Sequence, residues 1–337
     1  MKEKKKPVIY ENINLKSHHT FGVSVLASHF TQIQSERHLN YLITDKHWKN
    51  KRWYLLGGGS NILFRNNFKG LVIKNAIGGI DLLEDGKQHV LIEIGAGENW
   101  HKLVMKCVNN NWGGIENLAL IPGTVGAAPI QNIGAYGVEL EDVFHSLDAI
   151  KLNSGDCRRF SKDECDFGYR SSIFKKELKN RYVITKVRLK LKKNGEVETS
   201  YSSLQNQLEK NNIEEPGIRD VAEAVIQIRS KKLPDPQKIG NAVVSPEKFK
   251  ALKKEYSSIK GYNIGDDRIK LPAAWLIDKA GWKGKAIGEV STYQKQALVI
   301  VNKGNATAAQ IYDYAQKIKH DVHSKYGILL EEEVNIV

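Results

Sequence analysis

The chain has 337 residues, of which 41% are hydrophobic and 26% are charged, and this length allows a sizeable core divided between two or three domains. The formal net charge is +13. Apart from the N-terminal tail the lysines are spread along the sequence, and no nucleic-acid-binding motif is present. The charge therefore indicates either a surface that attracts an anionic small substrate or simply a lysine-rich composition, rather than nucleic-acid binding. No apolar run reaches the roughly 18 residues of a membrane helix, and the basic N-terminus lacks the apolar segment of a secretory signal, so we expect a cytoplasmic protein that binds no membrane.

The three cysteines, Cys107, Cys157 and Cys165, are odd in number and none has C-x-x-C spacing. This pattern supports neither a disulfide framework nor a zinc site. We therefore expect buried or incidental thiols and no bound metal.

The first part of the chain is predicted to alternate between strands and helices. Short apolar segments at 53–56, 70–74 and 89–94 are typical of strands. A helix is predicted from Trp100, because apolar residues then recur with helical spacing, and residues 109–114 end it.

The middle of the chain is predicted to form antiparallel strands within residues 143–192, including 147–152 and 182–191. Residues 195–217 are polar and are expected to form a loop at a domain boundary.

The last part is predicted to begin with a helix over 219–230, ended by Leu-Pro-Asp-Pro. A long helix then has Asn305 as its expected N-cap and Gly327 at its C-terminal end. Residues 328–337 are expected to form a final strand.

Four glycines and two prolines punctuate residues 121–137, a run without a charged side chain. A flexible linker would be polar, and a core strand would not tolerate so many glycines and prolines. Glycine lets a backbone approach another group closely because it has no Cβ, and successive free N–H groups form a concavity suited to a pyrophosphate. The run therefore predicts a site for a phosphorylated cofactor.

A second cluster, Gly57-Gly-Gly-Ser-Asn61, follows a predicted strand, where backbone N–H groups and a hydroxyl often bind phosphate. It matches neither G-x-G-x-x-G nor a P-loop, so the usual dinucleotide folds are not indicated. Taken alone, this cluster is more simply interpreted as a tight turn. The third cluster, Gly95-Ala-Gly97, is still weaker evidence for a phosphate site. Three such clusters between residues 57 and 137 favour a shared cofactor site.

Candidate catalytic groups come from two short segments. Arg170 lies among aromatic and small residues, where a guanidinium could clamp a carboxylate or stabilise a developing enolate. The alternative is an arginine stacked on Tyr169 at the surface. Glu331 and Glu333 share one face of the predicted final strand, where a carboxylate could transfer a proton, although such charge runs are usually only solvated.

A basic cluster, formed by Arg229, Lys231 and Lys232, ends the helix predicted over 219–230. These side chains either complement the helix dipole or bind a diphosphate.

Taken in order, these segments resemble the UDP-N-acetylenolpyruvoylglucosamine reductase family, flavoenzymes of peptidoglycan precursor synthesis. The resemblance runs from Thr20-Phe-Gly22 to Glu333-Val334, nearly the whole chain. Its motifs are Gly57-Gly-Gly-Ser-Asn61, Gly95-Ala-Gly-Glu-Asn-Trp100, Glu116-Asn-Leu-Ala-Leu-Ile-Pro-Gly123, Pro129-Ile-Gln-Asn-Ile-Gly-Ala-Tyr-Gly137, Phe167-Gly-Tyr-Arg170, Lys232-Leu-Pro-Asp-Pro236 and Trp275-Leu-Ile-Asp278. Single short motifs are weak, but this many in register are highly specific.

The resemblance implies an α+β fold, in which an FAD-binding PCMH-type (p-cresol methylhydroxylase) two-subdomain fold is followed by a smaller α/β substrate-binding domain. We expect the FAD-binding domain at 23–194 and the C-terminal substrate-binding domain at 195–337. The last strand, about 328–337, is expected to return to the FAD domain.

The resemblance also implies that NADPH reduces FAD, which then passes hydride to the enolpyruvyl group of a UDP-sugar. Arg170 and Glu333 match the family's catalytic arginine and glutamate, with the inferred role of stabilising an enolate-like intermediate. Tyr201, Lys232 and Gln296 match substrate contacts, and we expect a monomer. The residues expected to bind FAD are Gly57, Gly58, Gly59, Ser60, Asn61, Pro122, Gly123, Gly126, Ala127, Ile130, Gly134 and Gly137.

One departure from the family pattern concerns catalysis. After Asn241-Ala242 the family pattern runs Gly-Ser-Phe-Phe-Lys-Asn-Pro before Val-Val-Ser, whereas here Ala242 joins Val243 directly. The missing serine is the family's proton donor to the substrate carbon, the missing asparagine is a substrate ligand, and Ser245 aligns with a later, non-catalytic serine. Losing a general acid typically costs about 10²–10⁴-fold in rate, so we expect an impaired protonation step.

Three functions stay open on the sequence. They are a reductase of this family, a vestigial homologue that binds FAD or the UDP-sugar without turnover, and a flavin-dependent oxidase acting on another sugar. Retention of the five matched catalytic and substrate residues argues against the oxidase. The absent serine segment keeps the vestigial homologue open.

Overall fold

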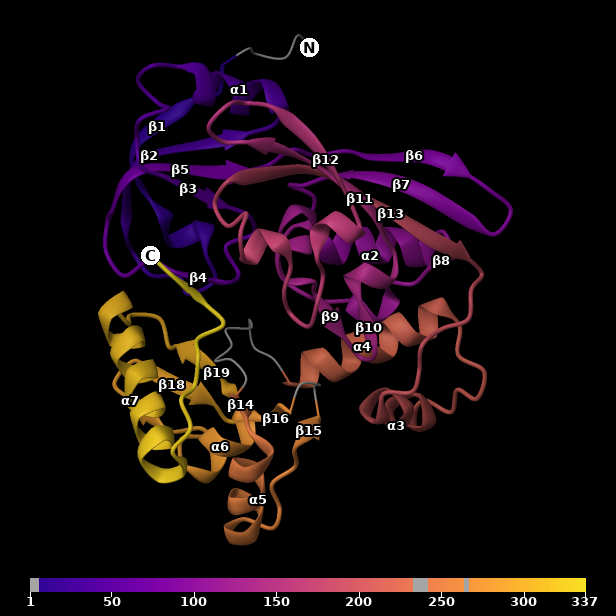
Figure 1. The fold of residues 1–337 in the computed structure, drawn as a ribbon, viewed down its shortest axis with the longest axis vertical. Coiled ribbons are helices and arrows are strands. Elements are labelled where there is room, and N and C mark those ends of the chain that lie inside the picture. Colours follow the sequence, from indigo (N-terminus) through magenta and orange to yellow (C-terminus); the bar gives the residue numbers. More distant parts are fainter. Residues whose placement is uncertain (1–5, 233–241, 264–266) are drawn as a thin grey trace. The chain divides into compact units, whose positions relative to one another are not determined.

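The computed structural model describes residues 6–232, 242–263 and 267–337. The chain divides into two compact units (Figure 1). The first unit takes the chain up to Ile13 together with Ala27–Gly58 and Lys69–Lys231, and the second takes Asn14–Leu26, Gly59–Phe68 and the chain from Lys232 onward.

Two sheets form the frame of the first unit. The smaller has the strand order β1-β2-β5-β3, and the larger has the order β12-β11-β13-β7-β6, with β8 beside β13. Strand β3 runs parallel to β5, whereas the pairs of the larger sheet are antiparallel. Their bounds are β1 Ile9–Asn14, β2 Leu26–Ile33, β3 Trp53–Leu56, β5 Phe68–Asn75, β6 Ile80–Asp85, β7 His89–Gly95, β8 Trp112–Gly113, β11 Phe144–Lys151, β12 Cys157–Ser161 and β13 Tyr182–Lys193.

Helices of the first unit cover the apolar faces of these sheets. Alternation along β13 turns Val187 and Leu189 into the main core while Arg188 faces the other way. Helix α2 (Trp100–Asn109) lies along the core face of the larger sheet (Figure 1). The other helices of this unit are α1 (Glu36–Thr44), α3 (Ser202–Lys210) and α4 (Ile218–Lys232), and a short hairpin is formed by β9 (Gly134–Ala135) and β10 (Val138–Glu139).

In its described residues, the second unit contains small sheets and the α-helices α5, α6 and α7. Its sheets have the orders β14-β16-β15 and β17-β18-β19, and β20 pairs in parallel with β4. The bounds are β4 Ile62–Leu63, β14 Ala242–Val244, α5 Pro246–Glu255, β15 Tyr262–Asn263, β16 Ile269–Leu271, α6 Ala273–Lys279, β17 Ala286–Ile287, β18 Val290–Tyr293, β19 Gln296–Asn302, α7 Ala308–Tyr326 and β20 Asn335–Ile336.

Most of the predicted elements are confirmed. Strands β3, β5 and β7 cover the three predicted apolar segments, α2 begins at Trp100, and β11 and β13 pair antiparallel within residues 143–192. Helix α4 covers the predicted helix, and Gly327 ends α7 in the left-handed conformation, with φ +62°.

Three predictions about elements were wrong. Residues 195–217 are not all loop, because α3 forms there and buries Leu204 and Leu208. The N-cap of α7 is Thr307 rather than Asn305, since Thr307 and Gln310 form a reciprocal capping box. The final strand is confined to β20, which has only two residues.

The boundary predicted between residues 194 and 195 separates the domain expected to bind FAD from the domain expected to bind the substrate. This boundary stays a prediction. In terms of packing, residues 195–231 lie within the first unit. Over the three described ranges, no helix is long and apolar enough to span a bilayer.

Candidate active site

Three glycine-bearing segments of the first unit lie against one another, backbone to backbone. A Cβ on Gly58 would stand 2.8 Å from the Cα of Gly123, and a Cβ on Gly126 would stand 2.5 Å from the Cβ of Ala96. Both distances are shorter than real Cβ contacts, so the absent side chain is what lets these segments meet. The glycines that the sequence predicts to approach a cofactor therefore also let separate parts of the protein backbone approach one another closely.

This packing leaves a set of backbone donors unused. Within the described residues, the N–H groups of Gly57, Gly58 and Gly123 donate no hydrogen bond, whereas Val125 and Gly126 donate to carbonyls of residues 98 and 96. Successive free N–H groups of this kind form an anion-binding concavity.

Arg170 is held in a defined position by the glycine-rich run. It lies in the turn 168–171 with φ +53°, and its guanidinium donates to the backbone oxygen of Gly134 at 2.7 Å. The arginine predicted to be catalytic is thus fixed on the segment predicted to bind the cofactor.

Backbone strain gathers around this arginine. Among the described residues, those with positive φ that are not glycine, asparagine or aspartate are Leu120, Tyr136 and Arg170. Such residues are uncommon in the left-handed region, and strained backbone tends to cluster at functional sites. Leu120 and Tyr136 meet at one further side chain, that of Arg229.

Arg229, from α4, is a buried cation that is only partly satisfied. It is 7% exposed, it donates to the backbone oxygen of Leu120 at 3.2 Å, and Tyr136 lies within hydrogen-bonding reach of it. Burial lowers the pKa of the Arg229 guanidinium, Tyr136 opposes this effect, and Arg170 adds to it. Its buried Nε has no acceptor in the described part of the chain, so a ligand acceptor would complete its bonding.

Tyr201 lies beside this group. It precedes α3, is 50% exposed, and packs edge-on against the ring of Tyr136 with 5.4 Å between ring centroids. The structure therefore brings Tyr201, Tyr136 and Arg229 together. The sequence predicts Tyr201 and indicates Arg229 only as part of a basic cluster. It gives no signal for Tyr136, because a left-handed backbone at this residue has no signature in residue type or spacing.

The other predicted cofactor residues of the first unit are spread along the same run. Ile130 is 40% exposed, Gly137 has φ +89°, Pro122 is exposed and Ala127 is half-buried. Their roles stay predictions.

The second unit carries the remaining predicted residues, among them Glu333. Asn61 donates from Nδ2 to the backbone oxygen of Glu333 at 2.9 Å, while the Glu333 carboxylate makes no hydrogen bond or ion pair within the described residues. The neighbouring Glu332 is ion-paired with Lys319 at 2.8 Å. Of these two glutamates, Glu333 is therefore the one left available for chemistry.

Gly59, Ser60 and Gln296 also belong to the second unit. A Cβ on Gly59 would stand 2.0 Å from the backbone oxygen of His18, and its φ is +70°, so glycine is required there for packing. Ser60 and Gln296 are half-buried, and Gln296 opens β19.

The region of the missing segment is only partly described. Lys232 ends α4, but its side chain lies outside the described part, as do residues 233–241. Ser245 is the N-cap of α5 and its Oγ accepts from the backbone N–H of Lys248 at 3.3 Å. This serine therefore has a structural role, in agreement with its alignment to the non-catalytic serine.

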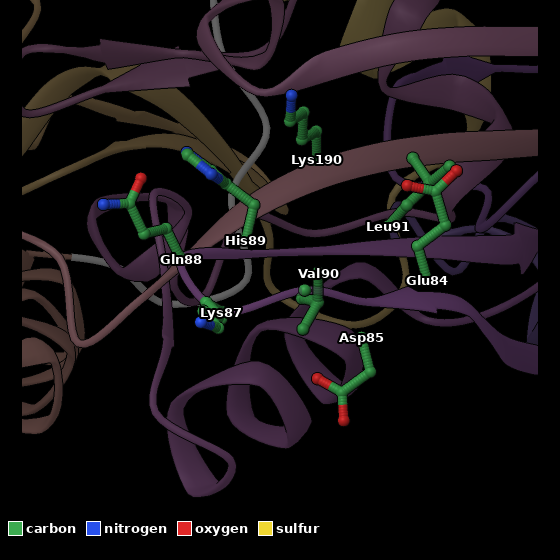
Figure 2. A pocket seen from close by; sticks show the side chains of 9 residues that line it. Glu84, Asp85, Lys87, Gln88, His89, Val90, Leu91 and Lys190 are labelled. Atoms are coloured by element: carbon green, nitrogen blue, oxygen red, sulfur yellow. The ribbon is translucent and has the colours of Figure 1, made fainter.

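A hollow in the first unit lies on the β6–β7 hairpin, lined by residues 84–91 and Lys190 (Figure 2). It contains none of the predicted site residues. Figure 2 shows its charged side chains spread around the hairpin rather than converging on one point, so we assign it no part in the chemistry.

Comparison with known proteins agrees with this geometry. Residues 27–161 match the FAD binding domain family, and residues 235–337 match the C-terminal domain of UDP-N-acetylenolpyruvoylglucosamine reductase. The chain is 40% identical over 337 residues to the UDP-N-acetylenolpyruvoylglucosamine reductase of Flavobacterium johnsoniae, which covers 98% of this chain and 99% of that one. The chain belongs to the UDP-N-acetylenolpyruvoylglucosamine reductase family.

Further members of this family support the assignment. The reductase of Amoebophilus asiaticus is 42% identical over 336 residues, covering 98% of this chain and 99% of that one. The crystal structure of the reductase from Thermus caldophilus has the same fold, with a TM-score of 0.69 at 23% identity, over 98% of this chain and 99% of that one. The predicted α+β fold, an FAD-binding domain followed by the C-terminal domain of this family, is confirmed.

The residues present fit FAD, the cofactor of the family's first domain. Its pyrophosphate needs N–H donors, and those of Gly57, Gly58 and Gly123 are unused within the described residues. The buried Nε of Arg229 offers one more donor. Which of these groups contacts FAD stays a prediction for each residue.

Proposed function

We propose that this chain catalyses the NADPH-dependent, FAD-mediated reduction of UDP-N-acetylglucosamine enolpyruvate to UDP-N-acetylmuramate, a step of peptidoglycan precursor synthesis. Membership of the reductase family supports the reaction. The observation that carries the proposal for the site is the 2.7 Å hydrogen bond from Arg170 to Gly134, because it fixes a cation on the predicted cofactor segment. We further propose a monomeric, cytoplasmic enzyme.

When bound, FAD would supply the hydride-transfer chemistry that links oxidation of NADPH to reduction of the enolpyruvyl group. The free backbone N–H groups of the glycine segments would hold its pyrophosphate. The Arg170 guanidinium stabilises the negative charge that develops on the enolpyruvyl carboxylate, and it does so without reorganisation because Gly134 already holds it. Glu333 supplies the second catalytic group, and Tyr201, Lys232 and Gln296 bind the UDP-sugar.

The protonation step is proposed to be slow in this chain. The family's donor serine belongs to the segment absent after Ala242, and Ser245 is engaged as a helix cap. Without a general acid the step loses about 10²–10⁴-fold in rate. The same observation supports the second candidate, a vestigial homologue that binds FAD or the UDP-sugar without turnover.

An anaerobic two-step experiment separates the two candidates. The flavin of the purified protein is reduced with NADPH, and the enolpyruvyl UDP-sugar is then added while flavin absorbance and product are followed. Flavin reoxidation matched by UDP-N-acetylmuramate formation supports the reductase. Reduction without substrate-driven reoxidation supports the vestigial homologue and overturns the proposed reaction.

A second experiment tests directly whether the absent serine acts as the proton donor. Insertion of Gly-Ser-Phe-Phe-Lys-Asn-Pro between Ala242 and Val243 is expected to accelerate flavin reoxidation by about 10²–10⁴-fold, the usual contribution of a general acid. The matched control carries alanine in place of the inserted serine and is expected to show none of this gain. Equal gains from both insertions would mean that the segment acts through packing or substrate binding rather than as a proton donor.

A further inference from the structure

The turn 168–171, which carries Arg170, and the adjacent Ser172 are tied to residues 130–134 at three points. The ties run from Ser172 Oγ to the oxygen of Ile130 (2.8 Å), from Asn132 Nδ2 to the oxygen of Gly168 (3.4 Å) and from the Arg170 guanidinium to the oxygen of Gly134 (2.7 Å). A left-handed arginine persists only where its surroundings over-determine the backbone. These ties supply that constraint.

Asn132, in the middle of this set, is itself held from the opposite side. It is fully buried and left-handed, with φ +42°, a conformation that asparagine tolerates. Its Nδ2 donates to carboxylate oxygens of Glu139 and Glu141, both at 2.8 Å, and its Oδ1 accepts from the backbone N–H of Glu141 at 3.1 Å. Because a backbone N–H can only donate, the last bond fixes the orientation of the amide.

One of the two carboxyl groups that hold Asn132, that of Glu139, also feels the charge of Arg170. Burial raises the pKa of Glu139, the neighbouring Glu141 raises it further, and Arg170 and Asp142 act in opposite directions, lowering and raising it respectively. Asp142 additionally accepts from the backbone N–H of Glu139 at 2.8 Å. One amide thus contacts both acidic side chains and the turn that carries Arg170, because the two hydrogens on its Nδ2 are shared among Glu139, Glu141 and the oxygen of Gly168.

We infer that Asn132, clamped by Glu139 and Glu141, is a positioning residue that holds the Arg170 guanidinium at the place where the enolpyruvyl carboxylate binds. The identity of that carboxylate rests on the proposed function. Asn132 acts through the turn 168–171 and need not touch substrate or cofactor.

The variant Asn132→Asp tests this role with almost no change of shape. It replaces the double donor by a third carboxylate beside Glu139 and Glu141, so the turn is expected to be released at neutral pH. Flavin reoxidation by the enolpyruvyl UDP-sugar should slow on the order of 100-fold, as for a misplacement of about 1 Å. The defect should shrink as the pH falls towards the pKa of the introduced carboxyl, about 4 or above, because a protonated aspartate donates one hydrogen again.

Two binding measurements need no turnover. Affinity for the enolpyruvyl UDP-sugar, read from the change in flavin absorbance, should fall in Asn132→Asp. Affinity for UDP-N-acetylglucosamine, which lacks the enolpyruvyl carboxylate, should be unchanged, as should flavin content and the rate of reduction by NADPH. Asn153→Asp, at an exposed turn residue, is the control for added charge and should match the unaltered protein. Equal weakening for both sugars, or loss of flavin in parallel with activity, would overturn the positioning role.

A crystal structure of Asn132→Asp decides the matter independently of the proposed function. A guanidinium displaced from the oxygen of Gly134 supports the inference, and one that remains there contradicts it. If neither sugar binds the unaltered protein, the proposed function fails, while this structural comparison still applies. Should Asn132→Asp not fold, Asn132→Gly suits the left-handed backbone, and it should show the same loss without recovery at low pH.

Discussion

At the scale of single residues, backbone contacts explain the glycines better than any ligand does. Gly58 faces Gly123 at a distance that leaves no room for a methyl group, and Gly126 faces Ala96 in the same way. The segments that meet there are the ones whose free N–H groups suit a pyrophosphate. The proposed cofactor binding and the packing therefore depend on the same absent side chains.

The variant Gly58→Ala tests this coupling. The added Cβ would lie 2.8 Å from the Cα of Gly123, a backbone atom that cannot rotate away, so the two segments must separate. We expect a loss of about 1–3 kcal/mol of stability, as for overpacking, together with reduced flavin retention. Both are measured on the purified protein, by thermal unfolding and by flavin absorbance after gel filtration.

Gly217→Ala is the matched control for this substitution. Its Cβ would stand 3.4 Å from Oδ2 of Asp220, an ordinary contact, and its φ is not positive. We expect Gly217→Ala to keep both the stability and the bound flavin of the unaltered protein. Full flavin retention in Gly58→Ala would separate packing from cofactor binding at this position.

The sequence identified Arg170 and Tyr201 but not the residues that hold them. Arg170 was found because Phe-Gly-Tyr-Arg is a motif that carries a resemblance. Asn132, Tyr136 and Arg229 matter through a left-handed backbone, a ring contact and an unpaired Nε. None of these is a property of residue type or spacing, so the sequence indicates Arg229 only as part of a basic cluster and gives no signal for the roles of Asn132 and Tyr136.

At the scale of elements, a chain of charges crosses the larger sheet on the face opposite the core. Asp148 on β11 accepts from Arg188 on β13 at 3.0 Å and from Arg159 on β12 at 2.8 Å, and Arg188 also pairs with Glu93 on β7. Asp148 and Arg188 are buried. Removing Asp148 takes away one of the two carboxylates that compensate the buried Arg188 and leaves it with Glu93 alone, and breaking such a buried network is destabilising.

The variant Asp148→Asn should therefore destabilise the protein by about 3 kcal/mol at pH 7. Burial would raise the pKa of Asp148, but hydrogen bonds from Arg188 and Arg159 outweigh burial and hold its pKa well below the ordinary value of 3.8. A depressed pKa in the folded state gives stabilisation that is present above the unfolded pKa and is lost as the pH falls below it. Urea unfolding should thus show a gap between wild type and variant that narrows below about pH 4.

Asp85→Asn controls for the loss of a carboxylate. Asp85 pairs with Lys193 but its side chain is 59% exposed, and such pairs contribute about 0–1 kcal/mol. A gap for Asp148→Asn that stays constant from pH 7 to pH 3.5 would contradict the account of its pKa.

Elements were predictable where periodicity and local chemistry agree, as for α2 and the pair β11–β13. Helix α3 was missed because its sequence, Ser202 to Lys210, is mostly polar and only Leu204, Gln207 and Leu208 are buried, so tertiary packing decides it. Residues 328–337 have the alternation of a strand, yet Leu329 is 70% exposed, and pairing is limited to a single bridge at Glu332 and to β20. Alternation of apolar and polar residues indicates that the two faces of a segment differ in polarity. It does not indicate that a neighbouring strand is present for the segment to pair with.

At the scale of the whole molecule, the two units interleave along the chain. Residues 14–26 and 59–68 belong with the C-terminal unit although they lie within the N-terminal part of the sequence. Periodicity is local and carries no information about such returns, so the predicted boundaries follow the order of the chain, apart from the return of the last strand that the resemblance implies. Only the fold reveals that Asn61 and Glu333, far apart in sequence, are hydrogen-bonded.

The net charge of +13 is a property of the whole molecule that bears on its proposed anionic ligands, NADPH and the UDP-sugar. A strongly basic surface accelerates encounter with an anion, and salt screens this attraction over about 8–10 Å at physiological ionic strength. We expect the second-order rate constant for flavin reduction by NADPH to fall on the order of tenfold as salt rises from about 20 mM to about 200 mM. The limiting rate at saturating NADPH is the internal control and should not change, because salt acts on encounter rather than on hydride transfer. Stopped-flow bleaching of the flavin over a range of NADPH concentrations measures both quantities, and a second-order constant that does not respond to salt would mean that the excess lysines lie away from the path of the ligand.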